Sequence, residues 1–318
     1  MSEDSSSGLQ NTTPRQRLKR WRILLLILGV ILTCWLGISY AVTKSLTSRK
    51  TRRQPEPIPA DVGVALQDVR IQCRDGIELG AWLFEGDADQ PCLILLHGNG
   101  GSRKTRQTGL EYHARVGRTV LAVTMRVHGD SDGDTNDFGY SQRLDVIAAV
   151  EWLQEHYPGR PIIINGRSLG AAAAIFAGQE LDHRVAGYVL EQPYKDLVSA
   201  CWNRVDSHLP PVLDVTAYCG MRLCAPLCLP VPIGEISPRN AVAQIPTDIP
   251  LLVIAGRDDR FARLNDVQAV CENCGPNMEL VILDDIGHIS FEDVIPDQYW
   301  PTVEKWLAEV KRREHPVD

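Results

Sequence analysis

The sequence predicts an α/β fold in which a mostly parallel sheet is flanked by helices. Beyond residue 66, short and largely apolar runs alternate with stretches of helical character. Strands that are buried on both faces have such continuous apolar runs, and their alternation with helices is typical of a parallel sheet covered on both sides. Hydrophobic residues make up 44% of the 318 residues, which is enough for a sizeable core.

The expected strands and helices follow one another in a regular order. A hairpin of residues 69–73 and 77–84 turns at Asp75-Gly76, a pair that favours tight turns. The later strand and helix pairs are 92–96 with 103–116, 120–125 with 141–156, 162–165 with 169–180, 251–255 with 262–272 and 280–283 with 298–312, and a further strand is expected at 185–190. Residues 195–246, rich in proline and cysteine, interrupt this order. We expect them to form an inserted lid over the carboxyl edge of the sheet, where chemistry is located in such folds.

The first 62 residues are expected to lie outside this fold. Residues 1–22 are polar and basic, which predicts a disordered tail, whereas residues 23–43 carry no charge. As a helix that run would be roughly 31 Å long, which matches the hydrocarbon thickness of a bilayer. We therefore expect a transmembrane helix at 23–43, a stiff proline-rich linker at 44–62 and the main domain at 63–318.

A cleaved signal peptide is the alternative to a membrane anchor. The apolar run is too long, and its leader too extended, for a typical signal peptide. We therefore expect a single-pass membrane protein. Five basic residues precede the run and five follow it, so the positive-inside rule does not select the side on which the domain lies.

Charge is distributed unevenly between the two ends of the chain. Residues 1–53 have a net charge of +8, so the whole-chain value of −7 leaves −15 on the remainder. An acidic body argues against broad binding to a phosphate backbone, and the basic residues flank an apolar run instead of forming a solvated arm. Nucleic acid is therefore not an expected partner.

A candidate nucleophile lies in Gly166-Arg167-Ser168-Leu169-Gly170, which matches the pattern G-x-S-x-G. The pattern alone is weak, but here an apolar strand precedes it and an alanine-rich helix follows it. Strand, tight turn and helix is the arrangement that a nucleophile elbow requires. The sequence therefore predicts that Ser168 is held at the carboxyl edge of the sheet. The alternative is a structural turn with an incidental serine, and Arg167 is either a structural cation or a site for an anionic substrate group.

A glycine-rich loop, His97-Gly98-Asn99-Gly100-Gly101, follows the strand at 92–96. Backbone N–H groups of such a loop can approach a reacting carbonyl closely, so we expect the N–H groups of Asn99 and Leu169 to form an oxyanion hole. A phosphate cradle is the alternative, but neither of the usual glycine-rich phosphate patterns is present. We expect His97 to brace the loop and not to act as a base.

Two further strand ends carry a carboxylate and a histidine. Gly256-Arg257-Asp258-Asp259 closes the strand at 251–255, and either aspartate can orient a catalytic imidazole, with Asp259 preferred. His288 lies just past the strand at 280–283, on a loop that suits a mobile base; a solvated loop histidine is the alternative. The order Ser168, Asp259, His288 is therefore the predicted catalytic triad.

The nine cysteines leave several possibilities open. Cys219, Cys224 and Cys228 form one cluster, and Cys271 and Cys274 form a C-x-x-C pair. The first cluster does not have the spacing of common zinc sites, so free thiols or disulfides are the remaining interpretations. No metal ion or organic cofactor is expected.

These motifs together resemble the α/β-hydrolase superfamily from about residue 66 to 312, most of all its membrane-anchored branches similar to monoglyceride lipase and to serine aminopeptidase. The segments that carry the resemblance are 97–101, 126–133, 166–170, 256–259 and 287–288. Thr124 stands where an aspartate is common in the family's loop after the fourth strand. The resemblance implies hydrolysis of an ester, thioester or amide through an acyl-serine intermediate, without a cofactor.

We therefore expect a serine esterase, lipase or thioesterase that acts on lipid-like or lipidated acyl substrates near a membrane. A serine peptidase of the same fold is one alternative. A catalytically silent hydrolase fold used for interaction is another, which the complete set of triad residues argues against.

Overall fold

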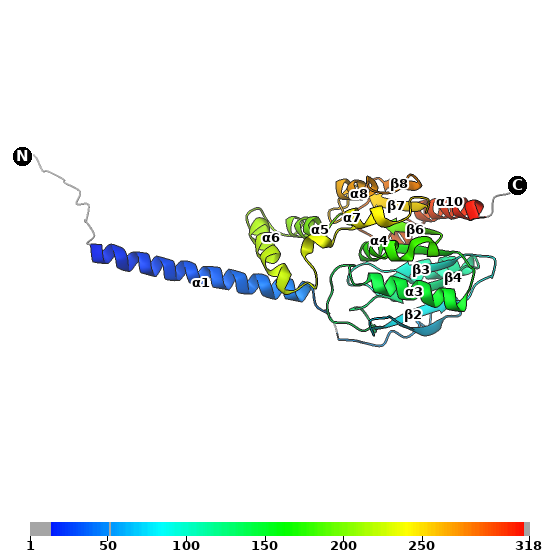
Figure 1. The fold of residues 1–318 in the computed structure, drawn as a ribbon, viewed down its shortest axis with the longest axis horizontal. Coiled ribbons are helices and arrows are strands. Elements are labelled where there is room, and N and C mark those ends of the chain that lie inside the picture. The colour runs from blue at the N-terminus through cyan, green and yellow to red at the C-terminus, as the bar shows by residue number, and fades with distance from the viewer. Residues whose placement is uncertain (1–13, 51, 315–318) are drawn as a thin grey trace, which may run out of the picture.

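The computed structural model describes residues 14–50 and 52–314 (Figure 1). In this part of the chain one sheet has the strand order β1-β2-β4-β3-β5-β6-β7-β8. β1 pairs antiparallel with β2 and β2 with β4, and the remaining neighbours are parallel. The strands are β1 (Gln67–Gln72), β2 (Glu78–Phe84), β3 (Cys92–Leu96), β4 (Thr119–Thr124), β5 (Ile162–Arg167), β6 (Gly187–Glu191), β7 (Leu251–Gly256) and β8 (Met278–Leu283).

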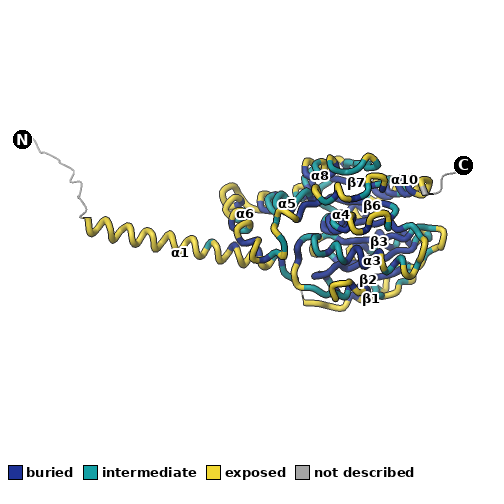
Figure 2. The backbone as a smooth tube through the Cα atoms, viewed as in Figure 1, coloured by how far each residue is buried: buried dark blue, intermediate teal, exposed yellow. Residues whose placement is uncertain are grey.

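Helices cover both faces of this sheet because alternate strand residues point in opposite directions. Ile94 and Leu96 of β3 pack with the helices α3 (Arg143–His156), α4 (Leu169–Leu181) and α8 (Leu264–Cys271). On the other face, Leu93 packs with α10 (Pro296–Glu314), and Leu95 packs near α2 (Gln107–Arg115). Central strands are buried along their whole length, which explains their unbroken apolar runs (Figure 2). The predicted mostly parallel sheet flanked by helices is confirmed.

The helix α1 (Pro14–Leu46) projects from the domain and is exposed over most of its length (Figures 1 and 2). It is longer than the expected span of 23–43. Residues 14–22, expected to be disordered, form its first turns, since proline is compatible with the first turn of a helix and the basic residues have adequate helix propensity. The rest of the expected tail, residues 1–13, lies outside the described residues.

The segment after α1 is not a free spacer but lies against the domain. Ser48 forms a β-bridge with Thr135 in the loop after β4. In the same loop, the Arg49 guanidinium donates to the carbonyls of Gly129, Ser131 and Gly133. Because charged side chains and backbone carbonyls make these contacts, the proline pattern of the linker does not predict them.

Further along this segment, the Glu56 carboxylate is buried beneath the loop after β4. Its Oε2 accepts a hydrogen bond of 2.8 Å from the Thr124 hydroxyl. The backbone carbonyl of Glu56 accepts from the buried Arg103. Thr124 is thus paired with a carboxylate supplied by the segment that follows α1.

Residues 195–246 form a helical layer beside the carboxyl edge of the sheet. It contains α5 (Leu197–Asp206), α6 (Leu213–Cys224) and α7 (Pro238–Ala241), with short 3-10 turns at Ala225–Leu227, Ile233–Glu235 and Val242–Gln244. Asp196 caps α5 by accepting a hydrogen bond from the Ser199 N–H at 2.7 Å. α6 packs against the last turns of α1 (Figure 1).

Candidate active site

Ser168 lies at a sharp turn between β5 and α4. Its backbone has φ of +52° and ψ of −105°, a strained conformation for a residue with a side chain. The turn is tight because the chain makes two close approaches where a Cβ would not fit. A Cβ on Gly166 would lie 2.5 Å from the Gly170 carbonyl carbon, and one on Gly170 would lie 2.7 Å from the Leu96 Cβ. The glycines of the motif therefore allow the elbow to form and place Ser168 at the carboxyl edge.

His288 lies beside the Ser168 hydroxyl. Its Nε2 is 3.2 Å from Ser168 Oγ, and its Nδ1 is 2.6 Å from Asp259 Oδ2. The three side chains come from the ends of β5, β7 and β8, which the sheet brings to one edge. The structure thus brings together the three residues that the sequence predicted as a triad.

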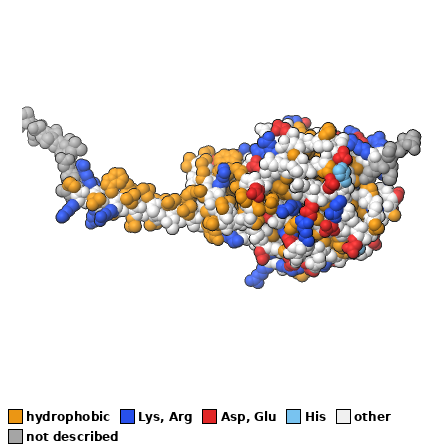
Figure 3. Space-filling view, in the orientation of Figure 1, with side chains coloured by type: hydrophobic (Ala, Val, Ile, Leu, Met, Phe, Trp, Pro, Cys, Tyr) orange, Lys and Arg blue, Asp and Glu red, His pale blue; other side chains and the backbone are white. Residues whose placement is uncertain are grey.

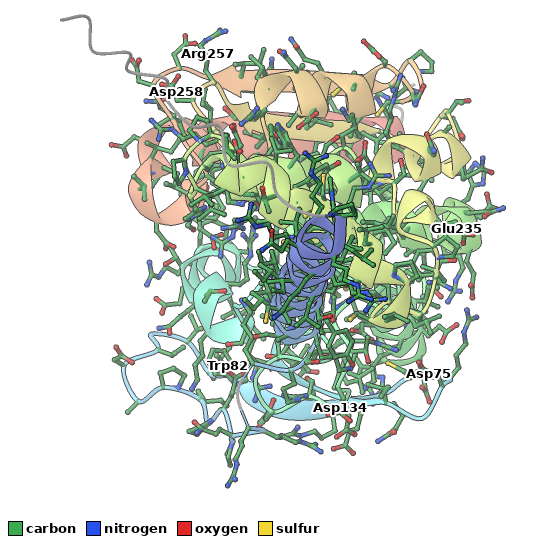
Figure 4. The ribbon with its side chains drawn as sticks, turned by 90° about the vertical axis from the view of Figure 1, so that its left-hand side faces the viewer. Asp75, Trp82, Asp134, Glu235, Arg257 and Asp258 are labelled. Carbon is green, nitrogen blue, oxygen red and sulfur yellow. The ribbon has the colours of Figure 1, made fainter. Side chains whose placement is uncertain are left out.

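Asp259 is fixed by its own turn. Its Oδ1 accepts hydrogen bonds from the N–H groups of Phe261 and Ala262 at 2.7 and 2.8 Å, which leaves Oδ2 for the imidazole. The neighbouring Asp258 is exposed and lies at the margin of the molecule beside Arg257 (Figure 4). Of the two adjacent aspartates, only Asp259 therefore contacts His288.

The loop that carries His288 is held from below by two contacts. Gln192, directly after β6, donates through Nε2 to the Gly287 carbonyl at 3.0 Å. A Cβ on Gly256 would lie 2.4 Å from the Ile286 carbonyl oxygen, so the loop lies directly on the end of β7. Phe261 packs edge-on against the imidazole, with 5.6 Å between the ring centroids. Sequence reasoning missed Gln192, although its place just past a buried strand end is the same signal that identified the other site residues.

The glycine-rich loop 97–101 lies next to the nucleophile. A Cβ on Gly98 would be 3.7 Å from the Ser168 Cβ. Leu169 begins α4, so the first turn of a helix, where backbone N–H groups have no intrahelical partner, lies at Ser168. Asn99 is exposed, and its side-chain oxygen accepts a hydrogen bond of 2.8 Å from Asn136.

Two buried histidines brace this loop. His97 Nδ1 donates to the Gly98 carbonyl at 2.8 Å and its Nε2 accepts from the Met125 N–H at 3.0 Å. His128 Nε2 accepts from the Gly100 N–H at 3.1 Å, and its Nδ1 donates to the Arg126 carbonyl. Burial lowers the pKa of both imidazoles, which keeps them neutral and allows each Nε2 to accept. His97 therefore has the bracing position expected for it, and His128 is a second brace that the sequence analysis did not identify.

Beneath the triad lies a buried ionic cluster centred on Arg106. Its guanidinium contacts Glu191 and Glu292, each at 3.3 Å. Glu191 also accepts a hydrogen bond of 2.6 Å from the Tyr299 hydroxyl, and its backbone carbonyl accepts from the Ser168 N–H at 2.7 Å. Burial raises the pKa of Glu292, an effect that Arg106 opposes. The cluster joins the turn at Ser168 to the helix that follows the His288 loop.

Arg167, directly before the nucleophile, is half-buried. One of its guanidinium nitrogens donates to the Thr105 carbonyl at 3.3 Å. This contact favours the structural interpretation of Arg167 over an anion-binding one.

The cysteines do not form disulfides; all nine are free thiols. Within the described residues, no group of three or more His, Cys, Asp or Glu side chains is placed to hold a metal ion.

Comparison with known proteins independently supports the α/β-hydrolase fold. The model of the α/β-hydrolase fold family matches residues 91–219. A monoglyceride lipase of Homo sapiens is 39% identical over 153 residues, which are 45% of this chain and 46% of that protein. An uncharacterised protein of Mycobacterium tuberculosis is 32% identical over 148 residues, which are 45% of this chain and 51% of that one. The chain thus spans about half the length of these curated relatives.

Among solved structures, an esterase of Pyrococcus furiosus superposes with a TM-score of 0.65 at 26% identity, over 81% of this chain and 98% of that one. The elbow, the sheet topology and these similarities agree with the resemblance seen in the sequence. The chain belongs to the α/β-hydrolase superfamily, and the proteins it resembles include a monoglyceride lipase and an esterase.

Proposed function

We propose that the chain is a membrane-anchored serine hydrolase that cleaves carboxylic ester or thioester bonds through an acyl intermediate on Ser168. The observation that carries this proposal is the continuous series of contacts from Ser168 Oγ through His288 to the buried Asp259. A nucleophile, a base and a residue that orients the base, in this arrangement, are what acyl transfer requires.

Each residue of the series has a defined role in the proposed reaction. Neutral His288 accepts the Ser168 proton at Nε2 as Oγ attacks the carbonyl carbon, and Asp259 stabilises the imidazolium that forms. His288 then gives this proton to the leaving group, which departs and leaves the acyl group on Ser168. In the second half, His288 activates a water molecule, which releases the acid and restores the serine.

The proposed oxyanion hole consists of the N–H groups of Leu169 and Asn99. Leu169 is at the N-terminus of α4, where the helix dipole favours negative charge. The position of Asn99 is supported by its bond to Asn136 and by the contact between His128 and Gly100 in the same loop. Preorganised donors of this kind contribute about 10²–10³-fold in rate.

The proposed substrates are lipid-like or lipidated acyl compounds. A monoglyceride lipase among the relatives supports this choice, as does the helix α1, which is long and apolar enough to cross a membrane. The most apolar 18-residue window of α1 has a mean hydropathy of 2.4, and its residues are largely exposed. The packing of α1 against α6 favours a retained single-pass anchor over a cleaved signal sequence, because cleavage would uncover that face of α6.

Hydrolysis of a panel of p-nitrophenyl esters of increasing acyl length tests the proposal. The full-length protein in detergent is compared with Ser168→Ala, and we expect turnover that falls to background in the variant. A serine peptidase of the same fold would also turn over aminoacyl amides, which an esterase leaves essentially uncleaved. Equal inactivity of two folded proteins on both substrate classes would favour the interaction module and overturn the proposal.

A further inference from the structure

The helix α6 carries an unpartnered apolar face next to α1. Val212, Val215, Cys219, Leu223 and Leu227 recur at intervals of three or four residues from the start of α6 into the turn that follows it, and all are exposed. This spacing puts them in one stripe. Leu223 is 62% and Leu227 73% exposed, whereas Gly220 and Cys224, on the neighbouring stripe, are buried. An apolar stripe of this kind is rarely left in contact with water in a soluble protein.

The buried stripe of α6 packs directly on α1. The Trp35 indole donates to the Thr216 carbonyl at 3.2 Å. A Cβ on Gly220 would lie 2.0 Å from the Ser39 hydroxyl, so only glycine permits the observed approach of the two helices. Ser39, which faces Gly220 in this contact, is buried. Small residues that let two helices approach closely are characteristic of helix pairs within membranes.

The position of this contact along α1 sets the depth of α6 relative to the bilayer. The contacts run from Trp35 to Ser39, which at 1.5 Å per residue lie about 6–12 Å from the end of the uncharged run at Thr43. If that run crosses the bilayer, as proposed above, α6 meets α1 at the depth of the acyl chains of one leaflet. Helices that rest in the interface are buried about 5–10 Å into the boundary between headgroups and acyl chains.

The charges on α6 agree with such a position. Asp214 and Arg222 are the charged residues of the helix. Asp214 is buried within the protein. The Arg222 guanidinium lies over the Tyr218 ring, and a long cationic side chain can reach the polar headgroups while its stem stays in apolar surroundings. Figure 3 shows hydrophobic side chains continuing from α1 over the adjoining end of the domain.

The lid connects this surface to the catalytic histidine. The Trp202 ring on α5 packs edge-on against Tyr218 on α6 at 5.3 Å. Also on α5, Arg204 lies over Phe261, which packs against the His288 imidazole. In the view along α1, the helix lies in the middle of the picture, with Asp134 below it and Asp258 at the upper left margin (Figure 4).

From this geometry we infer that α6 is a second membrane contact: the stripe from Val212 to Leu227 docks onto the lipid bilayer beside α1 and turns the carboxyl edge of the sheet towards the membrane. The inference rests on α1 lying in the bilayer but not on the chemistry at Ser168. A bilayer is favoured over a protein partner because the stripe is continuous with α1, whose apolar surface is exposed over most of its length in the described part of the chain.

Photo-crosslinking to lipid tests this contact in the full-length protein. The photoreactive residue p-benzoylphenylalanine replaces Leu223 or Leu227 in protein reconstituted into phosphatidylcholine vesicles that contain a fluorescent phosphatidylcholine. Leu28, within the uncharged run, is the positive control. Val116 is the matched negative control, since it is an exposed apolar residue, 44% accessible, just before β4 at the opposite edge of the sheet.

We expect at least about tenfold more lipid adduct at Leu223 and Leu227 than at Val116, as for side chains that reach the acyl region. Background labelling at both lid positions would overturn the inference, whether or not Leu28 is labelled. A product of twice the chain mass in place of the lipid adduct would also overturn it, by identifying a second copy as the occupant. Ser168→Ala should leave the pattern unchanged, so failure of the proposed chemistry and failure of the docking surface are distinguishable.

Discussion

Replacing Asp259 by asparagine tests the triad sharply, because the neighbouring backbone fixes the orientation of the new amide. Oδ1 of Asp259 accepts from two N–H groups, those of Phe261 and Ala262. The amide oxygen of asparagine must keep this place, since an NH₂ group there would face two donors. The NH₂ group of the variant therefore faces Nδ1 of His288, where the carboxylate oxygen now lies at 2.6 Å.

This reversal gives His288 the wrong tautomer. An NH₂ donor at Nδ1 requires that nitrogen to accept, so the ring proton moves to Nε2 and points at Ser168, 3.2 Å away. Such an Nε2 cannot accept the serine proton. A tautomer reversal of this kind lowers kcat by about 10⁴-fold, which corresponds to about 5 kcal/mol in the activation free energy.

Initial rates of p-nitrophenyl ester hydrolysis measure this loss. Asp258→Asn is the matched control, because that exposed carboxylate does not contact the imidazole, and we expect it to keep activity close to that of the parent protein. Circular dichroism checks that both variants are folded. Activity of Asp259→Asn within tenfold of the parent, in a folded protein, would refute the assignment of Asp259 as the residue that orients His288.

Three further predictions concern stability. Gly170→Ala should lower the free energy of unfolding by about 1–3 kcal/mol in a denaturant titration, because its Cβ would meet the backbone and Cβ of β3, whereas Gly234→Ala, in open space, should have little effect. Burial raises the pKa of Glu292 from 4.5 to about 7 in the folded protein. Its contribution to stability is therefore complete below the pKa of the unfolded chain and should be lost as the pH rises through the folded pKa. Glu292→Gln should therefore flatten the change of Tm between about pH 5 and 7, and the exposed Glu155→Gln should not. Arg49→Ala should leave carbonyls of the loop after β4 without their donor and increase proteolysis of the segment after α1; an unchanged cleavage rate would contradict the structural role of this contact.

The sequence carried enough information to predict the sheet and the meeting of Ser168, Asp259 and His288 at its carboxyl edge. Strands buried on both faces leave continuous apolar runs, and parallel pairing brings their carboxyl ends to one edge. A serine, an aspartate and a histidine that each follow such a run are therefore predicted to meet. The choice between Asp258 and Asp259 needed the turn geometry, because adjacent residues point in different directions.

The arrangement around α1 could not be predicted in the same way. Arg49 and Glu56 bind the loop after β4 through contacts with carbonyls and a hydroxyl group that are distant in the sequence. Such contacts have no periodicity, so proline content alone suggested a spacer. The glycine at position 220 shows where α6 meets α1, but its significance depends on Ser39, which lies 181 residues earlier. Likewise, the brace His128 is recognisable only when its partner Gly100 is known, whereas Gln192 directly follows a buried strand.

The central claim is that Ser168 is an activated nucleophile, and covalent labelling with a fluorophosphonate probe tests it most directly. The folded full-length protein is treated with the probe, digested, and the modified peptide identified by mass spectrometry. We predict one adduct, on Ser168, that is absent in Ser168→Ala and strongly reduced in Asp259→Asn. A folded parent protein without an adduct on Ser168, or equal labelling of Ser168→Ala, would contradict the account.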